Sequence, residues 1–214
     1  GGTVPGKGSE VLSKLIPGVP NSRGFRFKTK DGKQNLCLLY ASNDKSEWQN
    51  SFDPLTGLFI YHGDNKEVGV GVKDSTKAGM KFLNRIDAAI KSGNRKDVPP
   101  IFVFVKGYKG WDVRFIGLAV PGIKDQQKFL EEVQINNDIG TVSNYKSMYT
   151  VLNVDRISRK WIEDILDGNA YESQYAPDVW KKWVDANEFS PIEYKVDSFG
   201  LGLNQQSDDN RNPN

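Results

Sequence analysis

Short stretches in which apolar and polar residues alternate recur along most of the chain, and turn-forming residues separate them. Alternation with a period of two is typical of a β-strand that has one face in a hydrophobic core. One stretch, Ile101–Val105, is apolar throughout, as in a strand buried on both faces. Asp31-Gly32 and Asp53–Gly57 are strong turn signals. We expect strands at residues 25–28, 35–41, 58–62, 101–105, 111–120, 129–135 and 145–154.

Helical spacing of apolar residues appears in fewer places. The predicted helices cover residues 9–16, 82–90, 161–166 and 179–184. Gly93 and Gly168 follow two of these segments, as glycine commonly does at a helix end. Ser158 is suited to cap the third helix, and Pro177 suits the first turn of the fourth.

The order of these elements indicates the fold class. Strands follow one another through turns instead of alternating with helices, which favours an α+β fold over a doubly wound sheet. We expect a curved antiparallel β-barrel or crescent-shaped sheet flanked by helices, with a polar loop at residues 136–140. Residues 1–203 are expected to form one domain. Residues 204–214 are rich in Asn, Gln, Asp and Ser and are expected to be a tail or linker.

Composition adds a few constraints on partner and compartment. The 29 basic and 27 acidic residues leave a formal net charge of +2, so a basic surface for a polyanionic partner must be assembled by folding. The chain lacks a run of 18 apolar residues, so we expect no membrane span. A lone Cys37 cannot form an internal disulfide, which fits the reducing cytoplasm.

The segment Phe59–Lys66 gathers more functional groups than any other stretch. It follows the Asp53–Gly57 turn as an aromatic strand and ends in Gly-Asp-Asn-Lys. An aromatic face beside a carboxylate is what a site needs to hold a nucleobase outside its stack. An equally supported interpretation makes Tyr61 a core residue and Gly63-Asp64 a plain turn.

Other kinds of chemistry find little support. One His and one Cys cannot assemble a common zinc site, and the glycine motifs lack the setting of a phosphate-binding loop. Asp178, Glu193 and Lys195 have a spacing that metal-dependent nucleases use to activate water with magnesium. A helix-terminal Asp and a surface Glu explain the same residues better. We therefore expect no catalytic residue, no metal and no cofactor.

Several motifs, spread in order along the chain, carry a resemblance to a known family. They are Trp48, Phe52–Gly57, Tyr61–Lys66, Val98–Phe104, Asp112–Gly122, Asn144-Tyr145 and Thr150–Val154. From Pro17 to Ile192 the chain resembles the N-terminal domain of AspBHI-like modification-dependent restriction endonucleases, which is similar to SET- and RING-associated domains. The resemblance implies a crescent-like β-barrel that binds duplex DNA and flips out 5-methylcytosine or 5-hydroxymethylcytosine. It also implies a separate C-terminal nuclease domain and a bacterial, cytoplasmic restriction system.

Site residues follow from the resemblance. It implies that Tyr61 stacks on the flipped base and that Asp64 reads the cytosine edge. Residues 67–77 contain no aromatic residue, so Trp48, His62 or Tyr108 must supply a second ring. The base-binding candidates are Tyr61, His62, Asp64, Asn65 and Trp48, and the candidates for contacts with the DNA backbone are Lys66, Arg23, Arg26 and Arg114. Two alternative functions remain open: a sensor of another mark, such as a phosphorothioate backbone, and a small metal-dependent nuclease that uses Asp178, Glu193 and Lys195.

Overall fold

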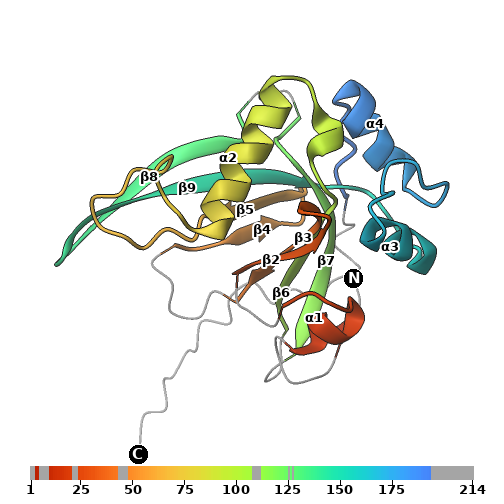
Figure 1. Ribbon diagram of the computed structural model, residues 1–214, viewed down its shortest axis with the longest axis horizontal. Helices are drawn as coiled ribbons and strands as arrows, with labels where there is room; N and C mark the ends of the chain where they lie inside the picture. The colour runs from red at the N-terminus through yellow and green to blue at the C-terminus, as the bar shows by residue number, and fades with distance from the viewer. Residues whose placement is uncertain are drawn as a thin grey trace, which may run out of the picture.

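The computed structural model describes residues 3–4, 10–20, 24–42, 48–107, 112–124, 126 and 128–193. Within them one sheet of nine strands is accompanied by α-helices and a short 3-10 helix, η1 (Figure 1). The strands are β1 (Thr3–Val4), β2 (Gly24–Lys30), β3 (Lys33–Ala41), β4 (Ser51–Asp53), β5 (Leu58–His62), β6 (Ile101–Lys106), β7 (Val113–Pro121), β8 (Leu130–Asn137) and β9 (Gly140–Val151). The helices are α1 (Glu10–Leu15), α2 (Ala78–Lys91), η1 (Arg95–Asp97), α3 (Arg159–Leu166) and α4 (Asp178–Ala186).

The sheet is curved and open. Its main path runs β2-β3-β6-β7-β9-β5-β4, with β1 added on β7 and β8 added on β9. The α+β class and the helix-flanked curved sheet expected from the sequence are confirmed. Two details differ from the expectation: β3 and β6 pair in parallel, and β2 and β4 do not pair with each other to close a barrel among the described strands.

The β2–β3 hairpin forms where the local sequence predicts it. Lys30 pairs with Lys33 across the two-residue turn Asp31-Gly32. Both turn residues have positive φ, 51° and 76°, which is the conformation that a tight hairpin turn requires and that Gly adopts without strain. The turn therefore fixes the register of the two strands.

Helices pack on both faces of the sheet. On one face, Phe82 of α2 lies with its ring centroid 5.0 Å from that of Phe27 and 6.2 Å from that of Phe25, both on β2. On the other face, Trp161 of α3 contacts Phe102 of β6 at 6.1 Å, and Trp180 of α4 packs on Trp161. The helical stripes expected from the sequence are thus confirmed as core. None of the described helices has the length and apolar character needed to cross a membrane.

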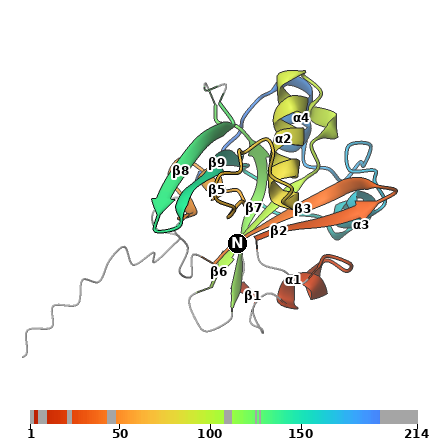
Figure 2. The same ribbon diagram turned by 60° about the vertical axis from the view of Figure 1, so that its left-hand side comes forward.

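Strands β8 and β9 form a long hairpin that extends to one side of the molecule in Figures 1 and 2. The polar loop expected at residues 136–140 is shorter than predicted, because Asn136 pairs with Thr141 within the ladder. The Thr141 hydroxyl donates a hydrogen bond to the Asn136 side chain at 2.7 Å, which holds these polar residues in the strands. The second half of β9 then lies between β5 and β7 and joins the hairpin to the main sheet.

Candidate nucleic-acid interface

The turn before β5 is built by its own side chains. The Asp53 carboxylate accepts hydrogen bonds from the Leu55 backbone N–H at 2.9 Å and the Thr56 hydroxyl at 2.6 Å. The hydrogen bond from Thr56 is the main cause that lowers the pKa of Asp53. Gly57 completes the turn with φ 71°. After the turn, β5 and with it the segment Phe59–Lys66 lie between β9 and the edge strand β4.

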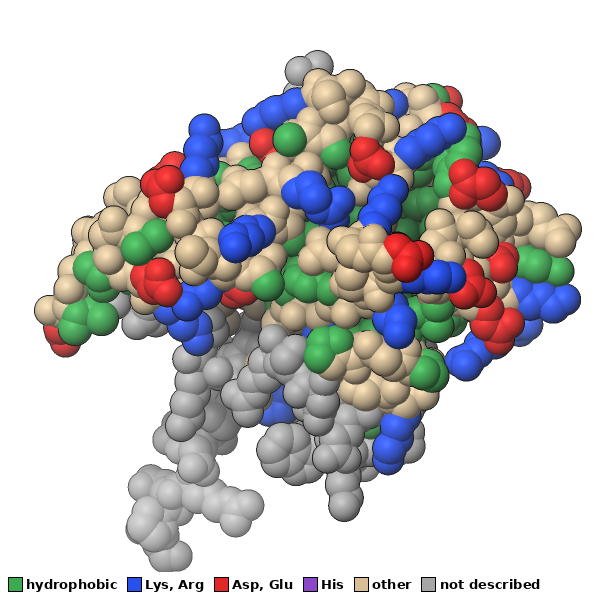
Figure 3. Space-filling model, viewed as in Figure 1, with side chains coloured by type: hydrophobic (Ala, Val, Ile, Leu, Met, Phe, Trp, Pro, Cys, Tyr) green, Lys and Arg blue, Asp and Glu red, His purple; other side chains and the backbone are tan. Residues whose placement is uncertain are grey.

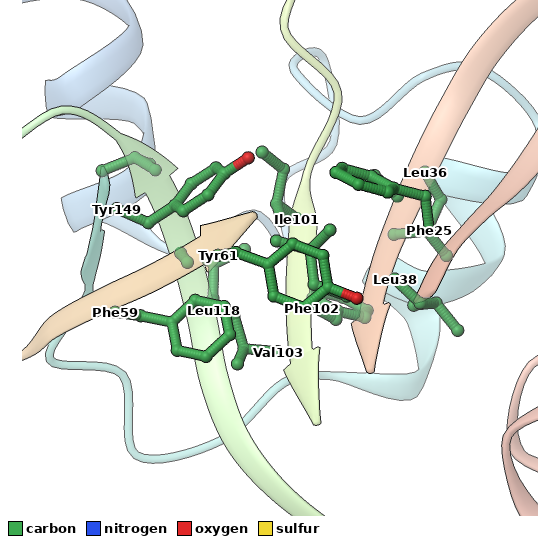
Figure 4. Packing of buried hydrophobic residues seen from close by; sticks show 14 of the residues in the cluster. Phe25, Leu36, Leu38, Phe59, Tyr61, Ile101, Phe102, Val103, Leu118 and Tyr149 are labelled. Carbon is green, nitrogen blue, oxygen red and sulfur yellow. The ribbon is translucent and has the colours of Figure 1, made fainter. Parts of the chain in front are cut away.

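Tyr61 lies in the core, as Figure 4 shows. Its ring is 3% exposed and packs against Phe25 at 5.1 Å and Phe59 at 5.6 Å. Its hydroxyl donates to the Tyr40 carbonyl oxygen at 3.1 Å, and burial raises its pKa. No open ring face is left for a base, so this conformation gives Tyr61 the core role and not the stacking role that the resemblance implied.

Asp64 holds the N-terminus of α2. One of its carboxylate oxygens accepts from the Gly79 N–H and the other from the Met80 N–H, both at 3.0 Å. Lys77, at the N-cap position of α2, makes no side-chain capping bond, so Asp64 supplies the cap from a distant part of the chain. A Cβ at residue 79 would clash with the Phe25 ring and lie 2.8 Å from the Asp64 Cγ, which explains the glycine. Asp64 remains half-exposed while it caps the helix.

Asn65 organises the segment between β5 and α2, residues 63–77, which we call the Asn65 loop. The Asn65 side chain is fully buried. Its amide donates to the carbonyl oxygens of Ser143 and Val70, and its oxygen accepts from the Ser75 hydroxyl and the Glu67 N–H. With both ends of the amide engaged, Asn65 is a structural residue in this conformation and has no group free for a base.

Two further side chains fix the Asn65 loop to its neighbours through three hydrogen bonds. The Asn144 amide on β9 donates to the carbonyl oxygens of Gly63 and Asn65, and the Asn84 amide on α2 donates to that of Val72. The sequence singled out Asn144 as part of a family motif without assigning it this role, and it missed Asn84, whose only signal is a polar amide within an otherwise amphipathic helix. Long loops that are pinned in this way are frequently functional.

Trp48 and His62 form an aromatic pair, and His62 directly precedes the Asn65 loop. Their ring centroids are 5.5 Å apart, with an angle of 33° between the planes, and both residues are half-buried. His62 lies opposite Lys146 on β9. Burial, followed by the charge of Lys146, lowers the pKa of His62. This pair offers aromatic surface that Tyr61 does not, on the opposite face of β5 because side chains alternate along a strand.

The lowered pKa of His62 predicts a pH effect on stability. His62 binds a proton more readily in the unfolded chain than in the folded chain. Stability is therefore expected to begin to fall as the pH drops below the ordinary His pKa of 6.5, and to stop falling below the lower pKa of the folded state. Urea unfolding of the parent and of His62→Gln between pH 7.5 and pH 5 would measure this. The parent should lose more stability than the variant over that range, and equal losses would contradict the assignment.

The predicted phosphate contacts are scattered. Lys66 is exposed in the Asn65 loop, and Arg114 is half-exposed on β7. Arg26 is fully buried, with its guanidinium 5.5 Å from the Tyr40 ring centre, and burial lowers its pKa. Arg26 cannot reach a phosphate in this conformation, because its side chain points into the interior of the molecule. Arg23 and Tyr108 lie outside the described residues.

The nuclease-like residues are also placed. Asp178 is the first residue of α4, where the helix dipole favours a carboxylate, and Glu193 is exposed. Lys195 lies outside the described residues. Among the part of the chain that the structure describes, no group of three His, Cys, Asp or Glu side chains is arranged to hold a metal ion.

Comparison with known proteins gives consistent matches. A family model described as restriction endonuclease AspBHI N-terminal matches residues 2–195. The structure of the DNA modification-dependent restriction endonuclease AspBHI is 32% identical, with a TM-score of 0.77, over 86% of this chain and 85% of that chain. The DNA recognition domain of the cytosine modification-dependent restriction endonuclease LpnPI is 29% identical, with a TM-score of 0.76, over 86% and 83%.

A third structure, the MspJI restriction endonuclease in complex with a 27-mer oligonucleotide, is 20% identical with a TM-score of 0.63 and supports the fold alone. The match covers 84% of this chain and 46% of MspJI. No curated protein sequence matches the chain. Because the family model spans nearly the whole described structure, the chain belongs to the AspBHI N-terminal family of restriction endonuclease domains.

Proposed function

We propose that this chain recognises duplex DNA that carries a modified cytosine, 5-methylcytosine or 5-hydroxymethylcytosine, and so targets a nuclease domain of a longer bacterial, cytoplasmic protein. The observation that carries the proposal is the similarity, over most of both chains, to a recognition domain whose name specifies cytosine modification. In this proposal residues 1–203 are the recognition domain and residues 204–214 the linker. The chain itself contributes no catalytic residue, metal or cofactor.

We assign to Asp64 the recognition of the hydrogen-bonding edge of the flipped cytosine. Its carboxylate is half-exposed, and the two N–H groups of α2 fix its orientation. Each carboxylate oxygen has a second lone pair, so Asp64 can accept from the exocyclic amine of cytosine while it caps the helix. Thymine lacks that amine. A hydrogen bond to a charged acceptor contributes about 1.5–3 kcal/mol, which offsets much of the cost of taking a base out of the stack.

The Trp48–His62 pair is the aromatic group that we assign to stacking, in place of Tyr61. Both rings are half-buried, and His62 lies two residues before Asp64. Stacking on one aromatic side chain contributes about 1–3 kcal/mol per base. Burial of the additional methyl group against an apolar surface adds about 1 kcal/mol, enough for up to about tenfold discrimination from unmodified cytosine.

The substitution Asp64→Asn tests the assignment. The Asn oxygen can accept from only one of the two α2 N–H groups that Asp64 caps, so one capping bond is lost. The NH2 group that replaces the other oxygen also meets the cytosine amine as donor against donor. We expect the affinity for the modified duplex to fall about ten- to a hundredfold and that for the unmodified duplex to stay unchanged. Fluorescence anisotropy at fixed salt, with unmodified, 5-methylcytosine, 5-hydroxymethylcytosine and phosphorothioate duplexes, would measure both.

Asp74→Asn is the matched control, because Asp74 is an exposed carboxylate in the same loop. It should keep the parental preference. A 2-aminopurine next to the modified base should brighten on binding if the base is flipped. Parental discrimination in a folded Asp64→Asn variant would refute the assignment of Asp64, and a parent chain that prefers the phosphorothioate duplex would refute modified cytosine as the target.

A further inference from the structure

A groove of about 640 Å³ lies between the β2–β3 turn and α2. The turn contributes Asp31, Lys33 and Gln34, and α2 contributes Lys81, Phe82 and Arg85. The lining thus has three cationic side chains against one carboxylate, beside an aromatic ring, and one of the cations, Lys33, is paired with Asp97 at 3.3 Å. None of these residues was assigned to DNA by the sequence or takes part in the proposed reading of the base.

Arg85 is held in place at one side of this groove. Its guanidinium donates to the Asp97 carbonyl oxygen at 3.0 Å and to the Gln34 side-chain oxygen at 2.9 Å, and lies 5.5 Å from the Phe82 ring centre. Both acceptors are neutral, and the nearby Asp97 carboxylate, which is paired with Lys33 at 3.3 Å, offsets only part of the positive charge of Arg85. A fixed, half-buried cation is preorganised to meet an anion.

Lys81 stands one helical turn before Arg85, and Lys77 one turn before Lys81, so the three cations form a stripe along α2. Lys77 is paired with Glu67 at 2.7 Å. Lys81 is exposed and makes no ion pair with any residue that the structure describes. The first turn of α2 also contains no acidic residue. Lys81 is therefore an exposed cation available to an external anion at the mouth of the groove.

The stripe begins at the Asn65 loop. Asp64 caps α2 at Gly79 and Met80, directly before Lys81. On the face shown in Figure 3, Lys and Arg side chains gather over α2. A DNA strand whose base meets Asp64 would thus have its neighbouring phosphates within the positive field of α2.

We infer that this groove seats a phosphate of the DNA backbone, with Lys81 and Arg85 as its cationic ligands. The inference rests on the proposed function and deepens it, since it gives the strand a path next to Asp64. Contacts with phosphates fix the register of a protein on DNA without reading sequence. Lys81 and Arg85 therefore position the duplex, whereas Asp64 discriminates.

Charge reversal at Lys81 tests the groove, with Lys182→Glu as the control. Lys182 is an exposed lysine on α4, whose Trp180 packs on α3 at the opposite face of the sheet, and its reversal changes the net charge equally. We expect Lys81→Glu and Lys81→Ala to weaken modified and unmodified duplexes alike, about fivefold to tenfold for Lys81→Ala in 100 mM salt. The slope of log K against log salt should become shallower by about 0.9, the value of one phosphate contact. Lys182→Glu should change neither.

The possible outcomes separate this inference from the proposed function. A Lys81→Glu variant that behaves like Lys182→Glu, while the parent still prefers modified cytosine, overturns the groove alone. A parent chain that binds all duplexes equally refutes modified cytosine as the target. The salt dependence of the Lys81 variants still tests whether the groove binds a phosphate. A third outcome would also overturn the proposal. Inorganic phosphate, titrated at constant ionic strength, would bind the groove and protect Lys81 from chemical modification, while Lys81→Glu left the affinity for DNA unchanged. The ligand of the groove would then be a free anion and not the DNA backbone.

Discussion

Replacing Tyr61 by alanine is expected to lower the free energy of unfolding by about 3–5 kcal/mol, the range for removal of a buried aromatic ring. The ring fills the space between Phe25 and Phe59, and its hydroxyl satisfies the Tyr40 carbonyl oxygen. The variant would lose both the packing and the hydrogen bond. Urea unfolding followed by tryptophan fluorescence would measure the change.

Tyr61→Phe separates the core role from a role in DNA binding. It keeps the ring and removes only the hydroxyl, so we expect a loss of about 1 kcal/mol in stability and parental DNA affinity. A fully stable Tyr61→Ala variant that had lost its preference for modified DNA would instead show that Tyr61 has a role in DNA binding and not in the core.

Replacing Asn65 by alanine is expected to cost about 3 kcal/mol in the free energy of unfolding. The substitution removes four hydrogen bonds and leaves buried donors and acceptors of the loop and of β9 without partners. Because the same bonds order the Asn65 loop, the Gly69 amide, which donates to Thr141, should also lose protection from hydrogen exchange.

Asn136→Ala is the matched control for Asn65→Ala. Asn136 is exposed on the β8–β9 hairpin and has one side-chain partner, Thr141. Its removal should cost less than about 1 kcal/mol and leave the Gly69 amide protected. If the two variants were equally stable, the Asn65 network would not be what holds the loop.

Local sequence was a good guide to elements whose cause is local. The β2–β3 hairpin follows from Asp31-Gly32, and α2 follows from its apolar stripe and Gly93. The three-residue strand β4 was not predicted, since Ser51–Asp53 is too short to show a period. The parallel pairing of β3 with β6 could not be predicted from local sequence either, because neither strand contains a pattern that specifies which strand it pairs with.

The sequence predicted where the candidate site lies, but it did not predict the role of each residue in it. Segment Phe59–Lys66 does lead into a loop with a half-exposed carboxylate. Whether Tyr61 or His62 faces the core depends on the register of β5 against β9, which the sequence left open. The partners of Asp64 are backbone N–H groups of a helix that begins fourteen positions later, and a backbone group leaves no mark in the sequence.

The parallel pair β3–β6 also constrains the order in which this chain can fold. The hairpin of β2 and β3 closes through two residues, whereas β6 reaches β3 only after the whole of residues 42–100 has been gathered into a loop. Closing a long loop costs chain entropy before any contact rewards it, and sheets dominated by such pairings fold slowly. During synthesis, the β3 edge that pairs with β6 therefore stays uncovered until β6 has emerged, and an uncovered strand edge can pair with another copy of the chain.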